Sequence, residues 1–341
     1  MLTNVLLRRG TASEWTTANS VLTSGEFGYE TDTGKFKVGD GSTAWSALGY
    51  FTPAEPPYIY QGSTAGYVMG YRLDIEEVSF ASDQNSIDFG DMLVVRDYIS
   101  GAHSSEHGYM SGGRDPATSN IVEKFPFSSG GTATDVGDLT VARFACSGNS
   151  SSENGYTSGG NPSNVIDKFP FASDSNATDV GDLTIAMGHR SSSQNSSENG
   201  YGAGGFSPAS AVSIIHKFSF TSDGNAVDIG DIGVARYGAV GQSSSESGYA
   251  SSGKTYPGFV YQSAVSKFPF SSDTNSVDVA TLVVPVNDGA GMSSTSHGYV
   301  GGGDGASIDT MIQKFTFVSD SNSVSIGNLL IERNRAEGTQ I

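Results

Sequence analysis

A Gly-Tyr pair recurs at nearly even intervals along most of the chain, and this repeat limits the possible folds more than any other feature. The glycines of these pairs are Gly66, Gly108, Gly155, Gly200, Gly248 and Gly298, with spacings of 42, 47, 45, 48 and 50 residues. A Lys-Phe pair follows the last five at Lys124, Lys168, Lys217, Lys267 and Lys314, and Glu77 stands at the equivalent position of the first copy. A chain that repeats at this period folds as an array in which each copy packs on its neighbours.

Each copy contains four short segments typical of β-strands. In the copy around residue 150 they span residues 143–147, 154–158, 165–171 and 177–186. Gly, Ser, Asn and Asp separate them, and these residues favour turns. Four strands in roughly 45 residues are typical of one propeller blade, and no long helical periodicity is present. We therefore predict an all-β chain in which residues 58–341 form a six-bladed β-propeller.

The repeats resemble the kelch family. As in kelch blades, the predicted second strands end in Gly-Gly doublets, at Gly112, Gly159 and Gly204. The Phe-Pro-Phe segments stand where that family has an aromatic strand before an Asp-bearing turn, and the stretch that ends at Arg143 is similar to the end of its fourth strand. The family's Trp is missing from every copy, and the fifth copy has a single glycine, Gly253. The resemblance covers residues 58–341 and implies a kelch-like propeller.

The C-terminal tail carries the markers of an innermost strand. In three copies a glycine stands seven residues before the Gly-Tyr pair, and an arginine stands five residues before that glycine. Arg333 and Gly338 show the same five-residue spacing. The first copy lacks both markers. We predict that residues 333–341 pair beside residues 66–70 and close the ring, because closure removes two exposed sheet edges.

Length variation is confined to the connection between the second and third predicted strands. From each Lys-Phe position to the next Gly-Tyr the separation is 31 or 32 residues, whereas from each tyrosine to the following lysine position it ranges from 10 to 18. In a meander that connection emerges on the same face as the crossover to the next blade, so one face carries the variability. Its longest example holds Tyr256, Phe259 and Tyr261, which we predict to bind a ligand because loops on a rigid scaffold commonly carry binding residues. The alternative is that this loop packs over a neighbouring blade or subunit.

Charge and composition exclude two kinds of partner. The formal net charge is −18 and the 18 basic residues are scattered, whereas nucleic-acid binding needs clustered Lys and Arg. No stretch of about 18 apolar residues is present, so we do not expect the chain to be embedded in a membrane. The single cysteine, Cys146, excludes an internal disulfide. It aligns with Ile99 and Ala239, which indicates a small inner-strand residue rather than a nucleophile.

Residues 1–52 do not share the repeat. Residues 27–31 and 35–38 flank Asp32-Thr33-Gly34, a pattern that predicts a short β-hairpin, and Trp45 is expected to pack back on it. The elements Arg-Gly-Thr, Glu-Trp, Gly-Glu-x-Gly-Tyr-Glu-Thr-Asp-Thr-Gly-Lys and Gly-Asp-Gly-x-Thr-x-Trp occur in this order. Together they closely resemble the small N-terminal module of bacteriophage tail fibres and receptor-binding proteins, including the major tropism determinant type.

This resemblance implies a module that lies at the virion-proximal end and commonly sits in a trimer. A module of this size buries little core by itself, which favours oligomerisation. We therefore expect residues 1–52 to attach the chain to other virion tail proteins and to two further copies of itself as a homotrimer. A Pro-rich linker at residues 53–57 follows.

No catalytic or metal-binding pattern stands out. The Asp-x-Asn turns, as at Asp174, superficially suggest calcium loops, but their spacing matches no EF-hand and one copy has Gly130 instead of the aspartate. We interpret them as Asx turns that cap hairpins. His107 and His297 stand where other copies have Asn or Ser, so a polar turn explains them better than a metal site. We predict no cofactor, no metal and no enzymatic activity.

These features predict a phage virion protein of a tail fibre or another external appendage. The N-terminal module attaches it to the particle, and the propeller binds a glycan or an outer-membrane protein on the host surface. Two alternatives stay open. One is a purely structural appendage, such as a baseplate, whisker or capsid fibre component. The other is a glycan depolymerase whose carboxylates come from distant blades.

Overall fold

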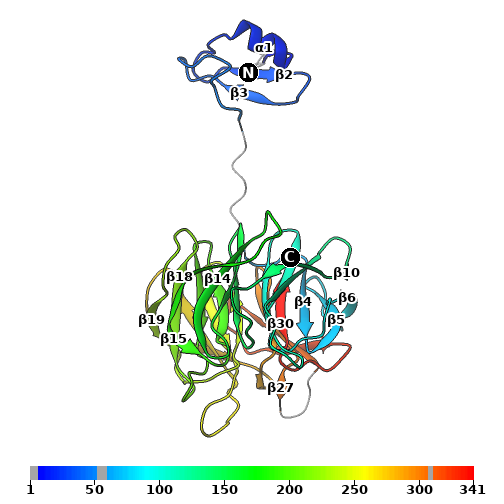
Figure 1. Cartoon of the computed structure of the whole chain (residues 1–341), viewed down its shortest axis with the longest axis vertical. Coiled ribbons are helices and arrows are strands. Elements are labelled where there is room, and N and C mark those ends of the chain that lie inside the picture. Colours follow the sequence, from blue (N-terminus) through cyan, green and yellow to red (C-terminus); the bar gives the residue numbers. More distant parts are fainter. Residues whose placement is uncertain (1–6, 52–59, 306–309) are drawn as a thin grey trace. The chain divides into compact units, whose positions relative to one another are not determined.

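The computed structural model describes residues 7–51, 60–305 and 310–341. The chain divides into two compact units, Met1–Pro57 and Tyr58–Ile341, both drawn in Figure 1. The described residues form thirty strands and one short α-helix, so the predicted β character is confirmed. No helix within these ranges is long and apolar enough to cross a membrane. The linker predicted at residues 53–57 lies outside the described residues.

The first unit is built on a three-stranded sheet. Its strands, in sheet order, are β1 (Arg8–Gly10), β2 (Phe27–Glu30) and β3 (Phe36–Val38). The antiparallel β2–β3 pair confirms the predicted hairpin. Trp45 packs back as expected, because its ring stacks on Trp15 at a centroid distance of 4.2 Å.

The helix of this unit, α1 (Ala12–Ala18), departs from the predicted hairpin module. It begins with a capping box in which Thr11 and Glu14 bind each other's backbone N–H groups, and this pair was its sequence signal. At 7 residues the helix is too short to show a repeated apolar pattern.

The second unit consists of six sheets, each built on a four-stranded antiparallel meander. The first contains β30 (Glu337–Gln340), β4 (Ala65–Gly70), β5 (Arg72–Ser79) and β6 (Ile87–Asp91), with β10 (Gly131–Thr132) added in parallel to β6. The second contains β7 (Ser100–His103), β8 (His107–Ser111), β9 (Ile121–Pro126) and β11 (Thr134–Asp138). The third contains β12 (Ser147–Ser150), β13 (Asn154–Ser158), β14 (Ser163–Pro170) and β15 (Thr178–Met187).

The remaining sheets follow the same plan. The fourth contains β16 (Ser192–Asn195), β17 (Asn199–Ala203), β18 (Ile214–Ser219) and β19 (Val227–Asp231). The fifth contains β20 (Val240–Ser243), β21 (Ser247–Ser251), β22 (Ala264–Pro269) and β23 (Val277–Thr281). The sixth contains β25 (Ala290–Ser293), β26 (His297–Gly301), β28 (Met311–Thr316) and β29 (Val324–Asn328), beside the short pair β24 (Val286–Asn287) and β27 (Asp304–Gly305).

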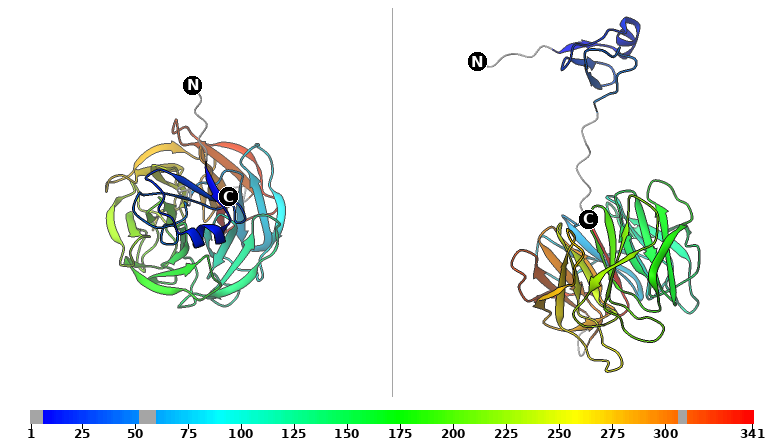
Figure 2. Two further views of the ribbon diagram at one scale, coloured as in Figure 1. Left: turned by 90° about the horizontal axis from the view of Figure 1, so that it is seen from above. Right: turned by 90° about the vertical axis from the view of Figure 1, so that its left-hand side faces the viewer.

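The sheets follow one another around a common axis, and the left-hand view of Figure 2 looks along it. Their innermost strands contact each other in the cycle β30, β7, β12, β16, β20, β25 and back to β30. The cycle is completed by the C-terminus, because β30 pairs antiparallel with β4 from Glu337 opposite Met69 to Gln340 opposite Gly66. The predicted closing strand is therefore confirmed.

Glycine recurs in the innermost strands because neighbouring backbones touch there. A Cβ added to Gly148 would clash with the carbonyl oxygen of Gly101 on the adjacent strand. Gly241, Gly291 and Gly338 meet the backbone of the preceding innermost strand in the same way. The glycine marker in the sequence therefore records the closest approach of one sheet to the next.

A stacked tyrosine–phenylalanine pair fills each interface between sheets. Tyr109 of the second sheet stacks on Phe171 of the third, with ring centroids 4.7 Å apart. The same contact recurs at Tyr67–Phe127, Tyr156–Phe220, Tyr201–Phe270, Tyr249–Phe317 and Tyr299–Phe80. The last of these pairs joins the sixth sheet to the first. The Gly-Tyr and Phe-x-Phe motifs are thus interface motifs.

The Asp-x-Asn turns bind the neighbouring sheet, which corrects their interpretation as hairpin caps. Asp174 forms an ion pair with Lys124 of the preceding sheet at 2.5 Å, and Asn176 accepts a hydrogen bond from the backbone N–H of Asp138 there. Equivalent ion pairs are Lys168–Asp223, Lys217–Asp273, Lys267–Asp320 and Lys314–Asp83. In the first copy Glu77 replaces the lysine, and the turn facing it has Gly130 instead of aspartate.

A buried arginine in each of four crossovers binds the sheet that follows it. Arg96 pairs with Glu123 at 2.7 Å, and Arg143 pairs with Asp167 at 2.8 Å. Arg333 pairs with Glu76 of the first sheet at 3.0 Å, and Arg236 donates to Ser266, which donates to Asp278. The segment predicted as a strand at 143–147 is this crossover, and strand β12 begins only at its last residue.

The two crossovers that lack an arginine at this repeated position face an uncharged group there. Gly188 and Val286 occupy the arginine position, and the residues at the position of the buried carboxylate are His216 and Gln313. A buried carboxylate without a partner would be strongly destabilising. Charge is therefore matched sheet by sheet around the ring.

The closing contact allows a direct test. Arg333→Val should lower the free energy of unfolding by about 3–5 kcal/mol, because it leaves Glu76 buried without its cation. Adding Glu76→Gln, which reproduces the Val286–Gln313 pairing of the sixth sheet, should recover much of that loss. Urea unfolding followed by far-ultraviolet circular dichroism measures both variants, since both tryptophans lie in the first unit. Equal stabilities of the single and double variants would contradict the pairing.

His216 should make the stability of the ring depend on pH. Burial lowers the pKa of His216 to about 4. Because this lies below the unfolded value of about 6.5, its contribution is complete above that pH and is lost as the pH falls toward 4. His216→Gln should therefore remove up to about 3 kcal/mol of the acid destabilisation. Urea unfolding near neutral pH and near pH 4 measures the difference, and an unchanged pH dependence in the variant would refute it.

Candidate binding face

The ring unit has two faces of different composition. On one face the connections between second and third strands lie against the crossovers, through backbone bridges from Asp97 to Arg114, His189 to Phe206 and Tyr237 to Lys254. The prediction that one face carries the variable connections is thereby confirmed. We call it the variable face, and β27 marks it in Figure 1.

Both chain ends of the ring unit lie on the opposite face. The carbonyl of Tyr60 accepts a hydrogen bond from Gln340 at 3.1 Å, and Gln61 donates to the carbonyl of Ser243 at 3.1 Å. Gln340 and Ser243 end two of the innermost strands. Burial raises the pKa of Tyr60 to about 12. The C-terminal Ile341 lies beside this segment, so the variable face carries neither end.

The predicted binding loop is divided between an exposed tip and an anchored base. Tyr256 and Phe259 are 42% and 57% exposed, and their rings meet edge to face at 5.4 Å. Tyr261 lies apart, with its ring 4.2 Å from the Lys254 ammonium, and Lys254 also pairs with Asp304 at 2.8 Å. The structure thus brings together two of the three predicted residues and makes the third an anchor.

The ammonium of Lys254 is held firmly in its charged form. Burial acts to lower its pKa, but hydrogen bonds to Asp304 and Tyr261 outweigh burial and raise the pKa above the usual range. The charge therefore fixes the base of the loop while the tip stays exposed.

Tyr256 belongs to a continuous row of aromatic rings across the variable face. The successive centroid distances are 6.0 Å for Phe144–Tyr98, 5.2 Å for Tyr98–His189, 5.1 Å for His189–Tyr237, 5.5 Å for Tyr237–Phe206, 5.2 Å for Phe206–Tyr256 and 5.4 Å for Tyr256–Phe259. We call these residues the aromatic row. They come from the crossovers and connections of the second to fifth sheets, and all except the exposed loop tip are half-buried.

Ion pairs border the aromatic row at Tyr98. Asp97 pairs with Arg114 at 3.4 Å and with Arg335 at 3.0 Å. Both guanidinium groups lie over the Tyr98 ring, at 5.1 and 5.0 Å from its centroid. One carboxylate thus places two arginines against one ring, and the cation–π contacts hold that ring in place.

A second group of ion pairs lies near the middle of the row. Arg190 pairs with Asp288 at 3.4 Å and with Glu337 at 2.9 Å. Burial raises the pKa of Glu337, and Arg190 opposes this shift. Burial lowers the pKa of His189, although Asp288 at 3.6 Å acts in the other direction. Near neutral pH His189 is therefore an uncharged aromatic member of the row.

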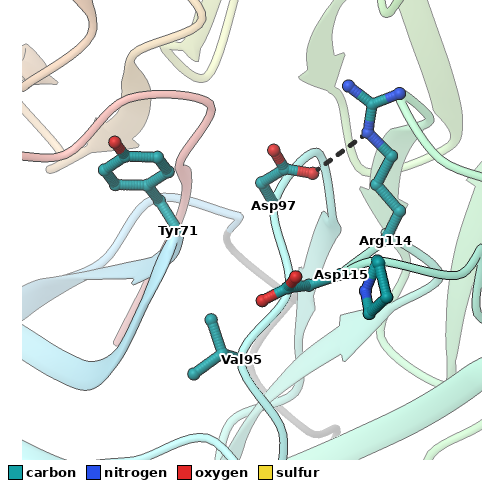
Figure 3. A pocket seen from close by; sticks show the side chains of 6 residues that line it. Tyr71, Val95, Asp97, Arg114 and Asp115 are labelled. Atoms are coloured by element: carbon teal, nitrogen blue, oxygen red, sulfur yellow. Dashed lines mark ion pairs between the residues drawn. The ribbon is translucent and has the colours of Figure 1, made fainter.

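A cleft of about 240 Å³ opens beside Asp97 and Arg114. Its lining residues are Tyr71, Val95, Asp97, Arg114, Asp115 and Pro116. Figure 3 shows the Asp97–Arg114 ion pair, with Tyr71 and Asp115 beside it. Within the described ranges no group of three or more His, Cys, Asp or Glu side chains is placed to hold a metal ion. The side chains of Asp97, Arg114 and Asp115 give the cleft hydrogen-bond donors and acceptors.

The sequence prediction found one end of the aromatic row and missed the rest. Tyr98, Phe144, His189 and Tyr237 stand two or three positions before an innermost strand. The preceding arginine and the glycine of the innermost strand recur in most copies, whereas these positions hold different residues in each copy. Aligning the six crossovers and looking for aromatic residues where the repeat breaks down would have identified them.

Comparison with known proteins gives short matches. Residues 5–43 match the family described as the major tropism determinant N-terminal domain. A hyaluronoglucosaminidase of Streptococcus pyogenes phage H10403 is 41% identical over 51 residues, and that of Streptococcus pyogenes phage H4489A is 46% identical over 48 residues. These matches cover 15% and 14% of this chain, and 15% and 13% of the two relatives. Residues 5–43 are thus similar to the tropism-determinant domain, and the similarity to the relatives is confined to a short stretch.

Proposed function

We propose that this phage-associated chain is a virion fibre protein that attaches to the particle by residues 1–52 and binds the host cell surface through its ring unit. The match of residues 5–43 to the major tropism determinant N-terminal domain carries this proposal. We place the protein in a tail fibre or another external appendage of the virion.

We further propose that the N-terminal unit joins three copies of the chain and contacts other virion tail proteins. Its buried core is small, with Trp15, Leu22 and Trp45 as the main members. Leu7 and Phe27, by contrast, are 51% and 40% exposed and line an apolar hollow. Exposed apolar surface on so small a unit is what self-association would cover.

We assign the ring unit to the six-bladed kelch-like propellers. Six four-stranded meanders around one axis support this assignment. The Gly112-Gly113 doublet supports it as well, because both glycines have positive φ, 62° and 94°, at the end of β8. Such a ring offers a rigid scaffold on which connections can change without disturbing the sheets.

The variable face is the receptor-binding surface in this proposal, and the receptor is a host surface glycan or an outer-membrane protein. Tyr60, the first described residue of the ring unit, lies on the opposite face. Three heads on one fibre would add weak contacts through avidity.

Two other functions stand beside this one. A purely structural appendage would use the N-terminal unit in the same way and make no host contact. A glycan depolymerase is favoured by the name of the two phage relatives, hyaluronoglucosaminidase. Incubating the full chain with hyaluronan and with host surface polysaccharide tests the enzyme, and we expect no shortened products.

The loop tip provides a test of host binding. The double substitution Tyr256→Ala and Phe259→Ala should weaken attachment of the full chain to host cells by about tenfold, because exposed aromatic side chains commonly dominate interface energetics. It leaves the Lys254–Tyr261 anchor intact. Flow cytometry of labelled protein on host cells measures the effect.

Val318→Ala is the matched control, because Val318 is an exposed apolar side chain in a turn on the opposite face. Attachment of the control should equal that of the unchanged chain. A structural appendage would give no attachment with any of these proteins, and immunogold labelling of intact particles would still find it on the virion.

A further inference from the structure

We infer that the aromatic row binds an uncharged linear polysaccharide, which lies along the row from Phe144 across the ring to the Tyr256 loop tip. This inference rests on the proposed host-binding function and names the ligand class and the residues that hold it. It also moves the centre of the site from the loop tip to the middle of the ring.

The shape of the site favours a chain over a small ligand. Seven rings follow one another at centroid distances of 5.1 to 6.0 Å, from connections of four sheets. These steps are similar to the rise per sugar unit of an extended polysaccharide. The C–H groups on one side of a sugar ring pack favourably on the electron-rich face of an aromatic ring. Successive rings from Tyr98 to Phe259 meet at interplanar angles of 69° to 87°, so the row presents ring faces and ring edges in alternation. The faces that no side chain covers provide sugar subsites along the row.

The row is not required by the fold. The residue two positions before the innermost strand has positive φ at Tyr98, Ala145, Gly238, Asp288 and Arg335. This conformation costs a bulky side chain more than it costs glycine. Tyr98 alone places an aromatic ring at this position, which points to a role outside the framework.

The charges at the row favour an uncharged ligand. Arg114 and Arg335 share Asp97, and Arg190 lies between Asp288 and Glu337. Over the two clusters three arginines face three carboxylates, so the row carries no net positive charge, and the net charge of the whole chain is −18. A polyanion would therefore find no net positive surface along the row and would be repelled by the chain as a whole. The hydroxyl groups of a neutral sugar, by contrast, can bind to the outward-facing edges of these paired groups.

A protein receptor fits the row less well. The centre of a protein–protein interface is usually depleted of charged residues, whereas here two clusters of ion pairs lie beside the central rings. Binding to a protein would leave these groups covered but without new partners. An uncharged polysaccharide keeps them hydrated on one side and hydrogen-bonded on the other.

Binding of the full chain to immobilised linear polysaccharides tests the inference. The panel contains uncharged glucans, mannans and galactans of increasing length, together with hyaluronan as the anionic member. We expect binding to at least one uncharged member, with affinity that rises with chain length and changes little between low and high salt. Tyr237→Ala, in the middle of the row, should weaken binding by about tenfold. Tyr237→Phe, which keeps the ring, should weaken it far less, and Val318→Ala should have no effect.

Three results would overturn the inference. One is the absence of binding to every uncharged member of the panel. Another is salt-sensitive binding to hyaluronan alone, which would identify a polyanion site. The third is an unchanged affinity of Tyr237→Ala. Attachment to host cells separates this failure from that of the proposed function: attachment that survives periodate oxidation of surface sugars but not protease treatment would keep host binding and replace the glycan by a protein.

Discussion

The close approach of neighbouring backbones at the ring axis is the contact on which the rest of the structure depends. Gly101, Gly148, Gly241, Gly291 and Gly338 allow one innermost strand to lie directly against the next, where a side chain would not fit. Glycine weakens a strand because it gains conformational freedom in the unfolded chain. The offsetting gain is that each sheet is brought near enough for its tyrosine to stack on the phenylalanine of the next sheet. The glycine contacts at the axis and the tyrosine–phenylalanine stacks between sheets therefore depend on each other, and both recur around the ring.

Charge matching shows how such a ring is closed in one way only. The lysine–aspartate pairs and the buried arginines connect each sheet to its neighbour, and both kinds of pair cross the junction between the last sheet and the first, at Lys314–Asp83 and Arg333–Glu76. Exposed ion pairs add little stability, and buried ones are sensitive to the loss of a partner. Here these ion pairs favour one order of the sheets around the ring over the others. A sheet placed out of order would set His216 or Gln313 against an arginine, or a buried carboxylate against Gly188.

The strands and the ring closure were largely predictable from the sequence, whereas contacts between separate elements were not. The even spacing of the Gly-Tyr pairs located the second strands, and the Arg333 and Gly338 markers located the closing strand. The Asp-x-Asn turns were misread because local spacing does not reveal a partner on another sheet, here Lys124 for Asp174. Helix α1 was missed because its capping pair, Thr11 and Glu14, precedes too few residues for a periodic pattern. At the binding face, Tyr256 and Phe259 were found from loop length, whereas the contacts of His189 depend on how four sheets meet.

The division between repeated and unrepeated positions separates the residues that hold the ring together from those that form the aromatic row. Repeated residues fill the interfaces, so their substitution would disturb every neighbour that the packing couples to them. Residues just before the innermost strands contact one another near the ring axis, as Tyr98, His189 and Tyr237 do. Substitutions there alter the aromatic row and leave the glycine contacts and tyrosine–phenylalanine stacks in place. Because the rings of the row come from four sheets, their spacing is set by the ring itself and not by any one loop. A ligand-binding surface of this kind inherits the stiffness of the scaffold, which lowers the entropy lost when an extended ligand binds.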